Sequence, residues 1–239
     1  MDAFIFLHGK QGGPNYDQCA LGKLAQEFVQ TGHLVSYKPY HWGYKDVFTD
    51  YAENTVQKII NEVNDLKLQG ASRIHLIGFS LGANLSLYCV SKLPDTFKSL
   101  VLLAPAHNIH LQQYKALVAK SYQLSKDLIN AGHGNTIHHF VDFNTAKKIN
   151  VPALPLHYIS FIDHDGPCNM EKSIDKIKNP ISVLMISGSN DSTQILSKVK
   201  IWTPLMKTEH SQLIQTRDTH DETCPLKYNL IQDWISTLP

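Results

Sequence analysis

The sequence lacks most of the features that mark specialised classes of protein. Its 239 residues include only four cysteines and no CxxC pair, so neither a disulfide scaffold nor a structural zinc site is expected. No apolar run approaches the roughly 18 residues that a membrane span needs. The 22 Lys+Arg and 21 Asp+Glu leave a formal net charge of +1, which removes the electrostatic basis for binding nucleic acid or an anionic membrane. What remains is a globular domain that handles a small molecule, with no cofactor and no metal indicated.

The N-terminus leaves the cellular location open. Met1 and Asp2 run straight into the apolar stretch Ala3–Leu7, without a basic n-region or a cleavage site. Either the protein is cytoplasmic, or a signal peptide has been removed and the protein is periplasmic or secreted. A Cys168–Cys224 disulfide is open only in the second case, and otherwise we expect partly buried thiols. The sequence does not indicate an oligomeric state.

Short apolar runs alternate with helical patterns along the chain. This alternation predicts an α/β fold, with a mostly parallel sheet of about six strands and helices on both faces. Asp50 and Glu53 form an N-terminal capping pattern for one of the helices. The expected strands are 3–7, 34–38, 73–78, 99–104, 181–187 and 212–215, and the expected helices are 17–31, 50–69, 81–92, 111–130, 193–202 and 226–236.

One segment is too long to be a simple crossover. Residues 1–105 and 181–239 form the expected core, and residues 106–180, here called the insertion, lie between two clear strands. Because ligands of open α/β sheets bind at the carboxyl ends of the strands, we expect the insertion to fold over those ends as a lid. The apolar stripe of its long helix either packs on the core or, with Tyr158 and Phe161, also roofs a substrate pocket.

The motif that points most directly to chemistry is Gly78-Phe-Ser80-Leu-Gly82. A strand enters it and a helix leaves it, which is the setting of a nucleophile elbow. In such an elbow the turn lifts the serine hydroxyl above the sheet, and the glycines allow a close approach of neighbouring backbone. Ser80 is therefore the candidate nucleophile.

A serine hydroxyl needs a base, and the base needs an orienting acid. His220 follows the last strand, in Arg217-Asp-Thr-His220, and is the candidate base. Asp191 follows the preceding strand at the tip of a Gly-containing turn, and is the candidate acid. The order Ser80, Asp191, His220 is the order found in α/β-hydrolases, not in chymotrypsin or subtilisin folds.

Acyl transfer also needs hydrogen-bond donors for the oxyanion. We expect one from the backbone N–H of Leu81, directly after the nucleophile. The second should come from the loop after the first strand, with the Lys10 N–H preferred and the Gln11 N–H as the alternative. His8 is expected to brace this loop.

Several further side chains are candidates for the substrate pocket. Tyr40 and Trp42 follow a strand at the same end of the sheet, where they either line an acyl pocket or only pack. Gln11 is a further candidate, and His107 either lines the pocket or has a structural role. The histidines of the insertion match no known metal-ligand spacing, so no metal site is expected.

These motifs together resemble an α/β-hydrolase-fold serine hydrolase over the whole chain. More narrowly, the chain is similar to a poorly characterised group of bacterial α/β hydrolases whose members often carry export signals. One departure is that fuller members of the fold have two strands before the His-Gly strand. The residues that carry the broad resemblance are Phe4–Gly9, Gly78–Gly82, Ser187–Asp191 and Asp218–His220; those of the narrower one are His8–Lys10, Gly70–Ile74, Ser80–Asn84, Ala104–His107, Tyr158–Asp163 and Gly166-Pro167.

The sequence therefore predicts an esterase-like serine hydrolase. Its triad would cleave a small-molecule carboxylic ester, or a thioester or amide, through an acyl-enzyme. Two alternatives stay open: a binding module of the same fold with little turnover, and a peptidase or acyltransferase that uses the same triad.

Overall fold

The computed structural model describes residues 1–10, 19–42, 47–110, 112–144, 147–191, 202–224 and 227–239. Its main sheet has six strands, all parallel, in the order β2-β1-β3-β4-β7-β8. The α/β class, the parallel sheet and the six strands expected from the sequence are confirmed. The strands are β1 (Asp2–Leu7), β2 (Leu34–Ser36), β3 (Arg73–Phe79), β4 (Ser99–Leu103), β7 (Ser182–Gly188) and β8 (Gln212–Thr216).

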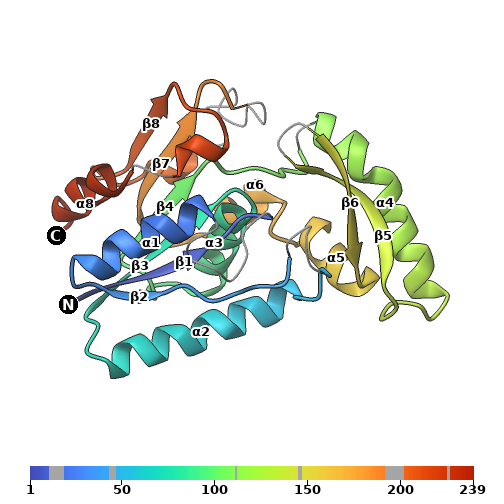
Figure 1. The fold of residues 1–239 in the computed structure, drawn as a ribbon, viewed down its shortest axis with the longest axis horizontal. Helices are drawn as coiled ribbons and strands as arrows, with labels where there is room; N and C mark the ends of the chain where they lie inside the picture. The colour runs from blue at the N-terminus through green and yellow to red at the C-terminus, as the bar shows by residue number, and fades with distance from the viewer. Residues whose placement is uncertain (11–18, 43–46, 111, 145–146, 192–201, 225–226) are drawn as a thin grey trace.

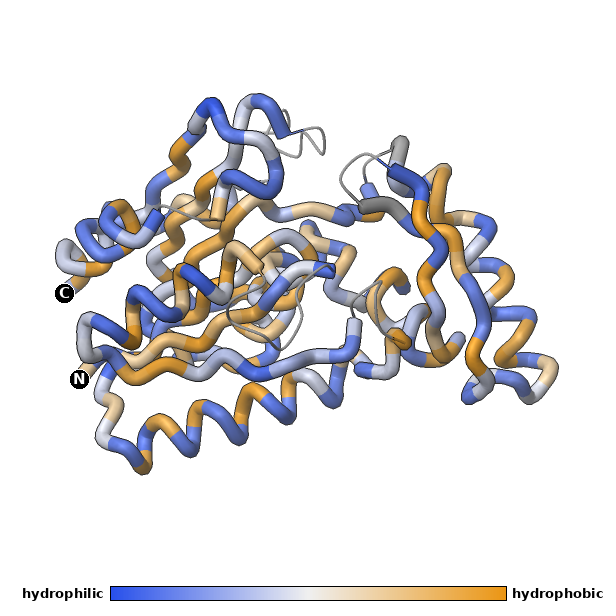
Figure 2. The backbone as a smooth tube through the Cα atoms, in the orientation of Figure 1, coloured by the Kyte–Doolittle hydropathy of each residue, from blue (hydrophilic) through white to orange (hydrophobic). Residues whose placement is uncertain are grey.

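Helices cover both faces of this sheet (Figure 1). Along β1, Ala3, Ile5 and Leu7 belong to the core on one face, whereas Phe4 and Phe6 belong to the core on the other. Successive side chains of a strand point to opposite faces, so a strand buried on both sides is apolar throughout. Figure 2 shows the central strands hydrophobic along most of their length. The first face packs against α2 (Ala52–Leu68) and α3 (Leu81–Lys92), and the second against α1 (Ala20–Gln30) and α8 (Tyr228–Ser236).

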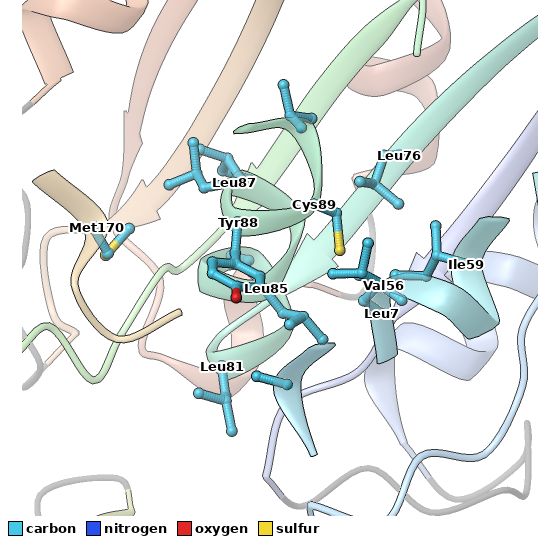
Figure 3. Close-up of a cluster of buried hydrophobic side chains, with 14 of the residues drawn as sticks. Leu7, Val56, Ile59, Leu76, Leu81, Leu85, Leu87, Tyr88, Cys89 and Met170 are labelled. Atoms are coloured by element: carbon cyan, nitrogen blue, oxygen red, sulfur yellow. The ribbon is translucent and has the colours of Figure 1, made fainter. Parts of the chain in front are cut away.

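Helix α3 is the most deeply buried helix of the core. Every residue from Leu81 to Val90 is buried. Figure 3 shows Cys89 of α3 beside Leu76 of β3 and Val56 of α2, so the helix is enclosed by the sheet and by its neighbours. A helix that is buried on all sides is held by its surroundings, which suits the element that begins directly after Ser80.

The insertion adds a second, smaller layer. It contains α4 (Gln112–Asn130), the antiparallel pair β5 (His138–Asn144) and β6 (Lys147–Ala153), α5 (Pro155–Ile162) and α6 (Met170–Lys176). In Figure 1, α4, α5 and the β5–β6 pair lie beyond the end of the sheet at which β1 stops, whereas α6 packs on α3. The Phe48 N–H donates to the Pro152 carbonyl at 2.7 Å, and the Ala52 N–H donates to the Ser160 hydroxyl at 3.1 Å. The insertion is thus tied to the segment that precedes α2 and to the first residue of that helix.

Three details differ from the expectations or lie outside what is described. Asp50 does not cap α2: Tyr51 is the N-terminal cap, and the Asp50 carboxylate instead accepts from the His41 N–H at 2.6 Å and pairs with Lys58. The expected helix 193–202 lies outside the described residues, apart from its last residue. All four cysteines are free thiols, so there is no Cys168–Cys224 bridge. In the described ranges, no helix has the length and apolar character to cross a membrane.

Candidate active site

Ser80 sits at the turn between β3 and α3. Its backbone has φ +55° and ψ −118°, a conformation that side-chain-bearing residues rarely adopt. The turn is held by the hydrogen bond from the Ser80 N–H to the Leu103 carbonyl, 2.9 Å long. A Cβ on Gly82 would lie 2.0 Å from the Leu7 carbonyl oxygen, so only glycine allows α3 to start this close to β1. The local sequence thus builds a sharp, strained elbow.

The three residues that sequence reasoning selected come together at one point. His220 Nε2 lies 3.0 Å from Ser80 Oγ, and His220 Nδ1 lies 2.7 Å from Asp191 Oδ2. All three side chains are buried. Because Nδ1 faces a carboxylate and donates to it, the Nε2 lone pair is left to accept the Ser80 hydroxyl proton.

The two loops that carry Asp191 and His220 brace each other. The Ser189 N–H donates to the Thr216 carbonyl at 2.7 Å, and the Asn190 N–H donates to the Asp218 carbonyl at 3.2 Å. The His220 ring also lies against Phe79, with centroids 5.2 Å apart. The carboxylate and the imidazole are thus positioned by backbone hydrogen bonds between the two loops and by the Phe79 ring.

The loop after β1 passes directly over Ser80. A Cβ on Gly9 would lie 2.9 Å from Ser80 Cβ, so the main chain at Gly9 is almost in contact with the serine. His8 Nε2 accepts from the Tyr40 N–H at 3.2 Å, while Nδ1 donates to the Gly9 carbonyl at 2.7 Å. The imidazole is therefore neutral, in line with burial lowering the pKa of His8. This geometry supports the bracing role expected for His8.

Two backbone N–H groups next to Ser80 are suited to an oxyanion. The Leu81 N–H is at the first position of α3, where a helix leaves its N–H groups unpaired. The Lys10 N–H follows Gly9 on the loop over Ser80. Among the described residues, neither group has a hydrogen-bond acceptor. The N–H of Gln11 and its side chain lie outside the described residues.

The Lys10 side chain points into the protein rather than to solvent. Its ammonium group lies 2.5 Å from Asp142 Oδ2, and both side chains are almost completely buried, at 3% and 1% exposure. It also donates toward His107 Nδ1 at 3.5 Å. Burial lowers the pKa of His107, and the positive charge of Lys10 lowers it further. His107 is buried in this polar cluster, with its ring against Tyr114 at 5.5 Å.

A narrow cavity lies between Leu81 and the insertion. The space is too narrow to hold a water molecule in this structure. Tyr158 and Phe161 line it, whereas Tyr40, Trp42 and His107 do not; the complete lining is Lys10, Phe48, Leu81, Tyr114, Asp142, Tyr158, Phe161, Ile162 and Cys168. Most of these walls are apolar, and the polar groups lie together around the Lys10–Asp142 pair.

Tyr40 and Trp42 pack beneath the loop after β1. Their rings stack at 4.4 Å, the Trp42 N–H donates to the His8 carbonyl at 3.0 Å, and the Tyr40 hydroxyl donates to Glu62 at 2.6 Å. The sequence left open whether Tyr40 and Trp42 line a pocket or only pack. In the structure both side chains pack, and they support the loop after β1. Within the described ranges, no group of three or more His, Cys, Asp or Glu side chains is arranged to bind a metal ion.

Comparison with known protein families identifies the family to which this fold belongs. Residues 2–147 match the family model for the alpha/beta hydrolase fold. The chain belongs to this family. No curated protein matches the sequence. The expected resemblance to α/β hydrolases is confirmed at the level of the family.

Solved structures of other α/β hydrolases superpose along almost the entire chain. A monoacylglycerol lipase from Paleococcus ferrophilus is 16% identical, with a TM-score of 0.69 over 98% of this chain and 91% of its own. A metagenome-derived lipolytic enzyme, from a study of LipS and LipT, is 16% identical, with a TM-score of 0.67 over 99% and 93%. Est1E from Butyrivibrio proteoclasticus, solved with ferulic acid, is 15% identical, with a TM-score of 0.64 over 100% and 89%. At these identities the likeness establishes the fold.

Sequence reasoning missed two charged residues of this α/β hydrolase. Asp142 lies on β5 and Glu62 on α2, and both carboxylates are buried. Glu62 accepts from the hydroxyls of Ser36 and Tyr40, each at 2.6 Å. Glu62 could have been found because it falls on the apolar face of α2, where an acid needs a partner. Asp142 carries no such signal, since β5 has a mixed polar pattern.

Proposed function

We propose that this α/β hydrolase is a serine hydrolase that cleaves a carboxylic ester through an acyl-enzyme. The observation that carries the proposal is the continuous chain from Ser80 Oγ through His220 to the Asp191 carboxylate, at 3.0 and 2.7 Å. The separations lie within the hydrogen-bond reach that nucleophile and base require. Buried, mutually oriented groups of this kind are the expected arrangement for nucleophilic catalysis.

The proposed reaction follows from the tautomer of His220. Ser80 Oγ attacks the carbonyl carbon while Nε2 takes its proton, and Asp191 stabilises the imidazolium that forms. The same proton then passes to the leaving alkoxide, which departs as an alcohol. A water molecule, deprotonated by Nε2, attacks the acyl-enzyme, and the acid leaves as Nε2 returns the proton to Ser80 Oγ. The backbone N–H groups of Leu81 and Lys10 would bind the oxyanion in both steps.

The substrate class is proposed from the cavity and from the fold relatives. The relatives described above are named as lipolytic enzymes, a lipase and a protein bound to ferulic acid. The narrow space beside Leu81 has apolar walls that include Phe48, Phe161 and Ile162, which suit the acyl part of an ester. Because this space does not hold a water molecule in the structure, an acyl group would enter it only as these side chains move apart. We therefore propose that the insertion forms the roof of the acyl site, and that Tyr158 and Phe161 contribute to it.

Two measurements on the purified protein test this proposal. The first is covalent labelling by a fluorophosphonate, which reports an activated serine. The second is hydrolysis of 4-nitrophenyl esters of increasing acyl length, which reports turnover and chain-length preference. We expect labelling and hydrolysis in the wild type and neither in Ser80→Ala.

Ser86→Ala is the matched control. Ser86 is buried on α3 and its hydroxyl donates to the Gly82 carbonyl at 2.8 Å, so the change removes a buried serine hydroxyl of the same helix without touching the triad. It should keep both labelling and hydrolysis. Hydrolysis that survives Ser80→Ala would refute the assignment of the nucleophile. A wild-type protein that binds esters without label or turnover would instead indicate a binding module.

A further inference from the structure

A buried ion pair connects the insertion to the loop that carries the proposed oxyanion donor. Lys10 follows β1 and Asp142 lies on β5, 132 positions later in the chain, yet their charged groups are 2.5 Å apart. Exposures of 3% and 1% mean that both charges have lost their water. Burying an ion pair is costly and contributes little net stability compared with apolar packing. Its presence here calls for a role beyond holding the fold together.

Asp142 is held in place from two other elements of the insertion. The Tyr158 hydroxyl of α5 donates to Asp142 Oδ2 at 3.1 Å, and the Tyr114 hydroxyl of α4 donates to Asp142 Oδ1 at 3.3 Å. Both tyrosines are buried. Burial and the neighbouring Asp142 charge raise the pKa of each phenol, so both remain donors. The carboxylate is therefore a fixed anchor point rather than a mobile surface group.

The loop after β1 is braced on its other side by the core. The Trp42 N–H donates to the His8 carbonyl at 3.0 Å, and the Tyr40 N–H donates to His8 Nε2 at 3.2 Å. Those contacts hold the start of the loop. Lys10 is the next residue but one, and the described contacts of its side chain are with Asp142 and His107. The loop thus has a core support at His8 and an insertion support at Lys10, with Gly9 against Ser80 between them.

We propose that Asp142 is a positioning residue, which orients the Lys10 backbone N–H toward the oxyanion by anchoring the Lys10 side chain. This inference rests on the proposed function. The insertion then has a part in the chemical step itself, because one of its carboxylates helps to fix an oxyanion donor. Preorganised donors are effective only when they are already aimed at the developing charge. Without the Asp142 anchor, the Lys10 backbone N–H is still present, but it is no longer oriented toward the oxyanion.

The insertion does not need this ion pair to stay attached. Its other ties to the core include the hydrogen bond from the Phe48 N–H to the Pro152 carbonyl and the one from the Leu154 N–H to the Phe48 carbonyl, 2.7 and 3.2 Å long. A variant without the pair is therefore expected to keep the insertion seated. This separates the positioning role from a purely structural one.

The test compares single and double neutral variants, Lys10→Met, Asp142→Asn and Lys10→Met/Asp142→Asn. Each single change leaves one buried charge unpaired, which destabilises the fold, whereas the double change leaves no unpaired charge and should recover stability. Lys10→Met keeps the backbone N–H. We expect all three to lower kcat for 4-nitrophenyl acetate by about 10- to 100-fold with an unchanged KM, because an oxyanion contact acts in the transition state.

Tyr122→Phe is the matched control. Its hydroxyl donates to Asp163 at 2.8 Å, so it links α4 to the end of α5 without touching Lys10. This variant should change thermal stability only, with kcat at the wild-type value. The decisive outcome is the double variant: recovered stability together with a low kcat supports the positioning role.

Three outcomes overturn the inference, and they are distinguishable. A double variant with wild-type stability and wild-type kcat overturns the positioning role while the proposed function stands, provided that the wild type is labelled by the fluorophosphonate. A wild type that is neither labelled nor hydrolytically active overturns the proposed function and this inference with it. A double variant that loses kcat only in proportion to its unfolded fraction also overturns the positioning role.

Discussion

Substitution of Gly9 by alanine is the most direct probe of the loop over Ser80. The added methyl group would lie 2.9 Å from Ser80 Cβ, and 3.3 Å from both Phe79 Cδ1 and the Phe79 carbonyl oxygen. Non-bonded carbon atoms are about 3.5–4.0 Å apart, so the loop and Ser80 must separate by about 0.6–1.1 Å. Gly9 does not have a positive φ, so alanine suits its backbone and only the contact matters.

The expected cost to catalysis follows from this displacement. A misplacement of about 1 Å in a catalytic site lowers the rate by about 100-fold, which corresponds to about 2.7 kcal/mol in the activation free energy. The added strain should lower the free energy of unfolding by about 1–3 kcal/mol. The assay is kcat for a small 4-nitrophenyl ester, measured beside urea unfolding of the same sample.

Gly134→Ala is the control for strain without catalysis. Its added methyl group would lie 2.9 Å from Leu156 Cγ, an equally tight contact within the insertion and remote from Ser80. It should lose stability, though less than Gly9→Ala because the Leu156 side chain can move, while keeping the wild-type kcat. The reasoning would be refuted by a Gly9→Ala protein with an unchanged kcat, or by equal losses of kcat in both variants.

Three further predictions follow from the site and from one buried histidine. Asp191→Asn should lower kcat by about 10,000-fold with little change in KM, because the amide favours the wrong tautomer of His220, and steady-state kinetics check this. Ser80→Gly should raise the free energy of unfolding by about 1 kcal/mol, measured in urea, while abolishing hydrolysis, since glycine adopts the φ of +55° without strain. Burial lowers the pKa of His75 from 6.5 to about 4. Between pH 4 and pH 6.5, His75 is protonated in the unfolded chain but not in the folded protein. The free energy of unfolding is therefore highest above pH 6.5 and falls on acidification, by up to about 3 kcal/mol near pH 4. His75→Asn should remove this share of the pH dependence of unfolding.

The core of the fold was predictable because its strands are buried on both faces. Such strands are continuous apolar runs, and β1, β4 and β7 stand out in the sequence for that reason. Helices α1 and α2 each have one apolar face, so their approximate limits also follow. The three candidate triad residues were found because each lies within four residues of the end of a strand of the predicted sheet. Their roles stay a prediction until the proposed experiments are done.

The insertion was less predictable because its pattern is set by distant partners. Along β5, Phe140 is buried, Val141 is 39% exposed and Asp142 is buried again, which is ordinary strand alternation. A carboxylate at the second buried position hides that alternation, because its partner Lys10 lies far away in sequence. Asp50 shows the same limitation. Its place in the sequence predicts a helix cap, but its carboxylate instead contacts His41 and Lys58.

The state of the thiols makes this protein convenient for single-site spectroscopy. Burial raises the pKa of Cys89, Cys168 and Cys224, so these thiols are protonated at neutral pH and shielded from reagents. Cys19, the one intermediate thiol, accepts from the Gly22 N–H at the start of α1. A cysteine introduced at Leu124, which is 43% exposed on α4, would therefore be the fast-reacting position for a fluorescent or spin label. Such a label would report changes in the surroundings of α4 during turnover.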